Sequence, residues 1–365
     1  MSNATEQIVA GEKLMCQIAL SFHPSYSHRQ FGADYGRRYH YDPIFRIETD
    51  QMVVKGLYRI FGEYGMGDPD PTPALGVSIQ PLDFMNAALG GRMNFKEDAS
   101  VETPDKPLSE IETISDVQEL QDIDWHKNAL LQDFFSQVEQ MTHTYPTIPI
   151  THVQGIWQEG ALGQNSFLTM HTPYTTAFRL VGQNILEIML IEDQLAVTIF
   201  EWLMRQYESL WNTICKRMGW RGTKVHFGDC AATMLSPKMY EHLCLPLYQK
   251  LMQNYDAAVI HSCGQSTHLL EHFAQIPKVS QLQLGYGTNL SRARQLFPKS
   301  SIIAYYDPGR LITDSPQDIA DHLWQMAEQL KTNFQISCGG VDPNTPPQNI
   351  YTYLEIGKSI QKTFI

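Results

Sequence analysis

Two cysteines and a histidine in the C-terminal half of the chain have the types and positions of a soft metal site. His261 and Cys263 follow an apolar run at residues 257–260, and Cys338 follows another at 334–336. Because alternate residues of a strand project to the same side, His261 and Cys263 should point in one direction. Thiolate and imidazole ligands select zinc over magnesium or calcium, and three protein ligands leave a fourth position open for a substrate. The pattern therefore predicts a catalytic zinc site.

Taken singly, these residues have simpler interpretations. An H-x-C pair is a weak signal, and a lone cysteine such as Cys338 is commonly a small buried apolar residue. What favours a shared metal is that all three stand at strand ends, just before glycines. A competing pattern at residues 268–272, H-L-L-E-H, matches the H-x-x-E-H motif of one metalloprotease class. It falls on the helix expected after Cys263, where we expect both histidines to face solvent.

Asp229 is the candidate catalytic carboxylate. It follows the apolar run at residues 224–227 and a glycine, and Ser236-Pro237 begins the next helix. A carboxylate at such a position can orient a substrate or accept a proton. The structural alternative is a hydrogen bond that braces the loop.

Apolar runs of strand length alternate with helical patterns, and this alternation predicts how those side chains are positioned. Eight runs are expected strands, and they begin at Cys16, Leu75, Ile148, Lys224, Ala257, Val279, Ser301 and Phe334. Strands separated by helices pair in parallel through right-handed crossovers. We expect an α/β fold, a single (β/α)8 barrel of the TIM type, whose functional side chains stand at the carboxyl ends of the strands.

The second of these runs is the weakest, and without it the alternative architecture is an open doubly wound sheet. No G-x-G-x-x-G or P-loop motif supports a nucleotide site in such a sheet. Residues 1–365 are expected to form one barrel domain, in which residues 1–145 are a less regular N-terminal extension. A chain of 365 residues is compatible with one domain because α/β barrels routinely exceed about 250 residues.

Composition excludes several classes of function. With 27 basic and 39 acidic residues, the net charge of −12 argues against a nucleic-acid partner. No run reaches the roughly 18–20 apolar residues of a membrane span, and the N-terminus does not resemble a signal peptide. Six cysteines in a chain of this length are expected to be reduced thiols. We therefore expect a cytoplasmic protein that does not associate with membranes.

With these motifs in place, the sequence resembles the uroporphyrinogen decarboxylase superfamily. The resemblance covers most of the chain and is strongest in its last 220 or so residues. It rests on Gln154-Gly155, Gly228-Asp229, Ser236-Pro237, Leu245-Pro246-Leu247-Tyr248, His261-Ser262-Cys263-Gly264, Tyr306-Asp307-Pro308 and Cys338-Gly339-Gly340. The decarboxylases carry an N-terminal M-R-Q-A-G-R-Y signature, whereas this chain reads S-F-H-P-S-Y at residues 21–26.

The other branch of the superfamily comprises zinc enzymes that resemble methylcobamide:coenzyme M methyltransferases. They bind zinc through H-x-C and a later cysteine, which His261, Cys263 and Cys338 match, and often through an acidic residue of the N-terminal region. The resemblance implies methyl transfer to a zinc-activated small thiol. The methyl donor would be a methylcorrinoid on a partner protein, because this chain lacks the D-x-H-x-x-G corrinoid-binding pattern.

Two alternatives remain at this point. A metal-independent decarboxylase-like lyase would need basic residues at the mouth of the barrel to bind a polycarboxylate. A non-catalytic protein would use zinc only to tie two strands together, in a closed site with four ligands and no room for a thiol.

Overall fold

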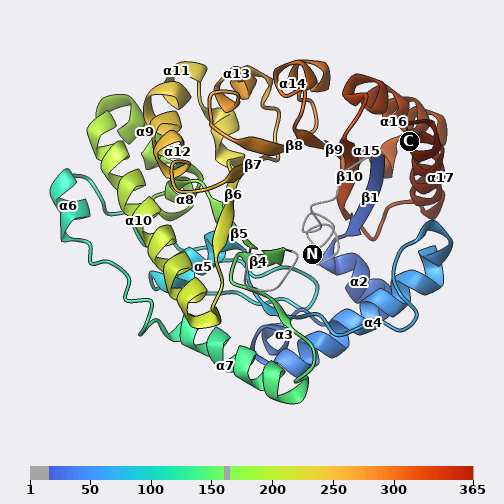
Figure 1. The fold of residues 1–365 in the computed structure, drawn as a ribbon, viewed down its shortest axis with the longest axis horizontal. Helices are drawn as coiled ribbons and strands as arrows, with labels where there is room; N and C mark the ends of the chain where they lie inside the picture. The colour runs from blue at the N-terminus through green and yellow to red at the C-terminus, as the bar shows by residue number, and fades with distance from the viewer. Residues whose placement is uncertain (1–15, 160–164, 365) are drawn as a thin grey trace.

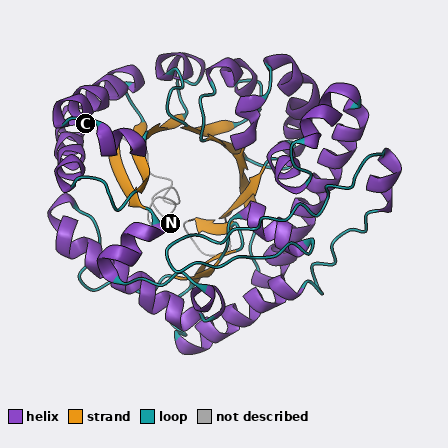
Figure 2. Ribbon diagram, turned by 180° about the vertical axis from the view of Figure 1, so that it is seen from behind, coloured by secondary structure: helices purple, strands orange, loops and turns teal. Residues whose placement is uncertain are grey.

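The strands form one sheet that curves into a ring inside a layer of helices (Figures 1 and 2). The computed structural model describes residues 16–159 and 165–364. The sheet has ten strands in the order β1-β10-β9-β8-β7-β6-β5-β4-β3-β2. Their bounds are β1 Cys16–Phe22, β2 Leu75–Val77, β3 Ile150–Val153, β4 Ile156–Glu159, β5 Asn165–His171, β6 Gly222–Gly228, β7 Ala257–Ser262, β8 Val279–Leu284, β9 Ser301–Tyr306 and β10 Phe334–Val341.

The predicted TIM-type architecture is confirmed. Each of the eight predicted strands is present and begins within two residues of its predicted start. All pairings are parallel except those of β4 with β3 and β5, and the first strand, β1, lies beside the last, β10. Among the described residues, β1 and β2 end the order and are not hydrogen-bonded to each other.

Two strands, β4 and β5, were not predicted from the sequence. Gln154 and Gly155 have positive φ angles of 30° and 73° and connect β3 to β4 as a two-residue hairpin. Polar side chains are buried in these added strands: Gln158 of β4 donates a hydrogen bond to Ser166 of β5, at 2.8 Å. Such internally paired polar residues break the apolar pattern by which a buried strand is recognised.

Helices connect the strands and alternate with them as predicted, most regularly after residue 129. Their bounds are α2 Pro24–Phe31, α3 Arg37–Tyr41, α4 Pro43–Phe61, α5 Pro81–Ala88, α6 Ile114–Glu119, α7 Ala129–Thr144, α8 Pro173–Leu180, α9 Asn184–Ile191, α10 Asp193–Met218, α11 Pro237–Met239, α12 Leu245–Leu251, α13 Leu270–Phe273, α14 Leu290–Leu296, α15 Pro308–Thr313, α16 Pro316–Leu330 and α17 Pro347–Phe364. The sequence pattern predicts one long helical region over residues 184–217, and the structure divides it at Glu192 into α9 and α10.

Ser-Pro motifs begin helices as predicted. Proline occupies the first turn, where its missing N–H costs no hydrogen bond. The hydroxyls of Ser236 and Ser315 accept hydrogen bonds from the backbone N–H groups of Met239 and Asp318 and cap the helices. In the described part of the chain, no helix is both long and apolar enough to cross a membrane.

Candidate metal centre

Three soft side chains meet at the carboxyl ends of two adjacent strands, β6 and β7. Gly228 pairs with His261 in the parallel register, and the N–H of Asp229 donates to the carbonyl of His261 at 2.7 Å. Cys230 and Cys263 each lie two residues beyond this pair. The sulfur atoms of both cysteines and one ring nitrogen of His261 lie within 4.8 Å of one another. We call Cys230, His261 and Cys263 the ligand cluster.

The donors of the ligand cluster fit a zinc ion in type and in spacing. Tetrahedral zinc takes thiolate sulfur at about 2.3 Å and imidazole nitrogen at about 2.0–2.1 Å. Donors bound to one tetrahedral ion at these lengths lie about 3.3–3.8 Å apart, so side-chain movements of about 1 Å at most bring the three atoms to bonding positions. Cys263 is exposed, whereas Cys230 and His261 are partly buried. The cluster can therefore be reached from outside, and no fourth His, Cys, Asp or Glu among the described residues closes it.

The two thiols differ in proton affinity. Hydrogen bonds from the Cys230 thiol and then from His261 hold the pKa of Cys263 well below its usual range. The same contact with Cys263, together with burial, raises the pKa of Cys230. The geometry thus favours a thiolate on Cys263, which is the form that binds metals.

Gln283 of β8 fixes the orientation of His261. Its Oε1 accepts hydrogen bonds from His261 Nδ1 at 3.1 Å, His226 Nε2 at 3.3 Å and the hydroxyl of Tyr305 at 3.3 Å. Its Nε2 donates to Gln281, so the amide cannot be turned around without losing contacts. Because Nδ1 of His261 carries the proton, Nε2 is the nitrogen available to a metal.

We therefore expect Gln283→Leu to weaken zinc binding about 10–100-fold without unfolding the protein, since the variant no longer orients the His261 ring. Competition with a chromophoric chelator measures the affinity. Gln335→Leu is the matched control, because Gln335 lines the same cavity from β10 and forms no hydrogen bond with the ligand cluster. Equal affinities for the two variants would show that Gln283 does not position His261.

Cys338, the third ligand predicted from the sequence, is not brought into the ligand cluster. In the register of β9 and β10, Ser337 pairs with Tyr305 and Cys338 pairs with Tyr306. Ser337 and Tyr305 line the cavity inside the ring. Since neighbouring residues of a strand point to opposite faces, Cys338 points toward the outer helices. Its side chain is 0 % exposed, and burial raises the pKa of its thiol to about 12.

Asp229 lies behind the ligand cluster and does not line the cavity. Its Oδ1 accepts a hydrogen bond of 2.6 Å from the hydroxyl of Thr172, the residue that caps α8. The hydroxyl of Thr175 accepts from the N–H of Ala231 at 3.2 Å. Asp229 is only 1 % exposed, and burial raises its pKa to about 6. These contacts tie the loop that carries Cys230 to the start of α8.

Cys230, a member of the ligand cluster, and Gly285, which packs against Cys263, were not identified as site residues from the sequence. A Cβ on Gly285 would lie 2.2 Å from the carbonyl carbon and oxygen of Cys263, so only glycine allows the loop after β8 to pack there. A signal for Cys230 was present: it stands three residues after the apolar run at 224–227, as Cys263 stands three residues after the run at 257–260. The alternative metalloprotease motif does not form a site among the described residues, because Glu271 pairs with Arg292.

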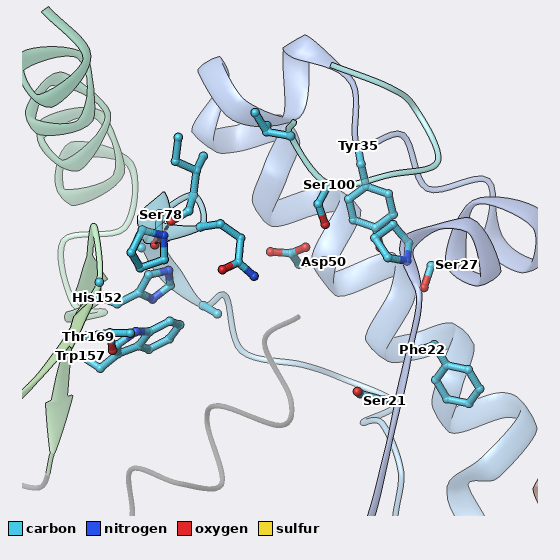
Figure 3. Close-up of a pocket in the computed structure, with 18 of the residues that line it drawn as sticks. Ser21, Phe22, Ser27, Tyr35, Asp50, Ser78, Ser100, His152, Trp157 and Thr169 are labelled. Atoms are coloured by element: carbon cyan, nitrogen blue, oxygen red, sulfur yellow. Dashed lines mark hydrogen bonds between the residues drawn. The ribbon is translucent and has the colours of Figure 1, made fainter. Parts of the chain in front are cut away.

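The ligand cluster opens onto a cavity of about 590 Å³ inside the ring. Cys230 and His261 line one part of it. Residues of the N-terminal third, among them Ser27, Tyr35 and Asp50, line another (Figure 3). The volume is that of a small-molecule site.

Comparison with solved structures finds a protein whose fold is similar. The structure of a methyltransferase from Methanosarcina mazei aligns over 96 % of this chain and 93 % of its own, with a TM-score of 0.59 and 14 % identity, which is a likeness of fold. A GH30 endoxylanase from Clostridium papyrosolvens C71 aligns over 96 % of this chain and 74 % of its own, at 10 % identity and a TM-score of only 0.36. No curated protein matches the sequence significantly.

The family comparison is the decisive one. The model of the uroporphyrinogen decarboxylase (URO-D) family matches residues 167–360, which is more than half of the chain and includes the ligand cluster. The family predicted from the sequence motifs is thereby confirmed. The chain belongs to the uroporphyrinogen decarboxylase (URO-D) family.

Proposed function

We propose that this protein is a zinc-dependent methyltransferase, which moves a methyl group from a methylcorrinoid on a partner protein to a small thiol. The observation that carries the proposal is the ligand cluster, two thiols and an imidazole within 4.8 Å at the edge of an internal cavity. Cys230, His261 and Cys263 would hold the ion. The fold shared with a methyltransferase is consistent with this assignment.

The chain's own residues have distinct tasks in this proposal. When bound, zinc lowers the pKa of a coordinated thiol, so that the nucleophilic thiolate is present at neutral pH. Gln283 holds Nδ1 of His261 in a hydrogen bond and so leaves Nε2 as the nitrogen that can bind the ion, and the cavity would hold the acceptor close to the cluster. The acceptor sulfur would supply the electron pair of the new S–C bond, the pair of the broken Co–C bond would remain with the partner's corrinoid, and the thiol proton would pass to solvent.

Asp229 was predicted to be catalytic, and we now propose a positioning role for it. Its carboxylate accepts a hydrogen bond from Thr172, and Asp229 is not among the residues that line the cavity. It would act through Cys230, the next residue, by fixing the loop that carries this thiol.

The decarboxylase alternative is not favoured by the cavity. A polycarboxylate substrate requires cationic side chains directed at it. Among the described lining residues, the only Lys or Arg is Arg46. Its guanidinium already donates to the carbonyls of Tyr39 and Gly76 and to Oε1 of Gln137.

The proposal is tested by methyl transfer from methylcobalamin to a panel of small thiols, together with the zinc content of protein purified without added metal. We expect about one zinc ion per chain and transfer by the wild type, with transfer lost in Cys263→Ala. Cys215→Ala is the matched control, because Cys215 is a partly buried thiol of α10, remote from the cluster. Equal transfer by wild type and Cys263→Ala would exclude the zinc mechanism.

A further inference from the structure

A single carboxylate of the N-terminal third faces the cavity. Asp50 belongs to α4, and Figure 3 shows it directed into the space between Tyr35 and Ser100 on one side and Ser78 and His152 on the other. Its Oδ1 accepts a hydrogen bond of 2.8 Å from the hydroxyl of Tyr39. No other described residue forms a hydrogen bond or an ion pair of 4 Å or less with this carboxylate.

Arg46 is the one charged Lys or Arg among the described lining residues; its charge opposes the rise that burial causes in the pKa of Asp50, but it forms no ion pair of 4 Å or less with the carboxylate. Asp50 is the only Asp or Glu among the described lining residues, and the N–H groups of Arg46 are directed at the three neutral acceptors named above, not at the carboxylate. Burial lowers the pKa of four lining histidines, to about 4 for His40 and to about 3 for His152, His171 and His226. These rings are therefore neutral near pH 7.

Aromatic rings accompany the carboxylate. The rings of Tyr35 and Tyr39 are 5.1 Å apart and edge to face, and Trp157 stacks on His152 at 4.0 Å. Tyr35, Tyr39 and Trp157 all line the cavity. A carboxylate beside aromatic rings is a binding environment for an ammonium group, and it repels anions.

Burial raises the pKa of Asp50, because a carboxylate loses hydration in the cavity. A bound cation would oppose this cost by pairing with Oδ2, to which no described residue donates a hydrogen bond. Asp50 is not part of the ligand cluster, so the two polar features of the cavity can bind different groups of one molecule.

We propose that Asp50 binds a positively charged amine of the methyl-accepting substrate, so that the acceptor is an aminothiol. The thiol of the acceptor would lie at the ligand cluster and its ammonium group at Asp50. This inference rests on the proposed methyl transfer, and it predicts a preference for cationic over neutral and anionic thiols. The ammonium group undergoes no chemical change.

The first test is a binding measurement that requires neither metal nor turnover. Calorimetric titration of metal-free protein with 2-(methylthio)ethylamine, the product expected from 2-aminoethanethiol, should show binding. Asp50→Asn should weaken it at least about tenfold, as expected for a lost charge-assisted hydrogen bond. Asp50→Glu should retain binding, and 2-(methylthio)ethanol should bind the wild type at least about tenfold more weakly. Glu48→Gln is the matched control, since Glu48 is an exposed acid of the same helix.

The second test is methyl transfer to 2-aminoethanethiol, 2-mercaptoethanol and 2-mercaptoethanesulfonate. A preference for the amine in the wild type that disappears in Asp50→Asn supports the proposal. Equal binding of the amine by wild type and Asp50→Asn, or a preference for the sulfonate, overturns it. Loss of zinc from Asp50→Asn also overturns it, because Asp50 would then be a metal ligand.

The two proposals fail separately. Amine binding that depends on Asp50, without transfer to any thiol, refutes methyl transfer and leaves an ammonium site. Transfer to all three thiols at equal rates in wild type and Asp50→Asn supports methyl transfer and refutes the ammonium site. Thermal denaturation of each variant confirms that binding is measured on folded protein.

Discussion

Cys230→Ala and Cys263→Ala are each expected to lower the affinity for zinc by roughly 100-fold or more, whereas Cys338→Ala is expected to leave it unchanged. Loss of residues that only support a ligand already costs about 10–100-fold, and loss of a thiolate ligand should cost more. Cys230 and Cys263 have their sulfur atoms within 4.8 Å of His261. Cys338 lies on the outer face of β10. Chelator competition on the purified variants measures the difference.

The comparison separates two ligand sets. If Cys338→Ala loses zinc and Cys230→Ala retains it, the set predicted from the sequence is correct, and β10 must rearrange when the metal binds. Cys244→Ala serves as the control for removing a fully buried thiol, because Cys244 neither belongs to the ligand cluster nor lines the cavity. Circular dichroism of each variant shows whether a loss of zinc follows from unfolding.

The positions of Cys230 and Cys338 show which features of the metal site could be predicted from the sequence and which could not. Strand ends were recognisable, so His261 and Cys263 were placed correctly at the carboxyl end of β7. The face on which a strand-end residue lies depends on register and on where the strand stops. The apolar run that predicts this strand ends at residue 336. In the structure β10 continues to Val341, so Cys338 lies within the strand. Because successive side chains of a strand alternate between its faces, an error of one residue in the register assigns a side chain to the wrong face.

The far side of the cavity could not be predicted, for a different reason. Asp50 and Tyr39 belong to the helices of the N-terminal third, and only tertiary contacts bring them to the cavity onto which the ligand cluster opens. Helical spacing of apolar residues predicts a helix over residues 50–64, whereas α4 begins earlier, at Pro43, with Asp42 as its cap. That shift places Asp50 in the middle of α4 rather than at its start. Periodicity locates a helix but does not identify which of its polar residues a distant strand will face.

Arg294→Met is expected to destabilise the protein by about 3–5 kcal/mol while leaving the zinc affinity of the folded protein unchanged. Arg294 belongs to α14 and is 8 % exposed. Its guanidinium donates to five backbone carbonyls, those of Phe297, Ser300, Leu330, Thr332 and Asn333. These carbonyls lie just before β9 and β10 or at the carboxyl ends of α14 and α16. Most of them would be left without a hydrogen-bond donor in the variant.

The control is Arg292→Met on the same helix. Arg292 forms an exposed ion pair with Glu271, and such pairs contribute at most about 1 kcal/mol. Urea denaturation of both variants gives the free energies of unfolding. Arg294 acts at the amino-terminal ends of the strands, and the ligand cluster lies at their carboxyl ends, so stability and metal binding should be separable in this barrel. A fall in zinc affinity in folded Arg294→Met would show instead that the two ends of the strands are coupled.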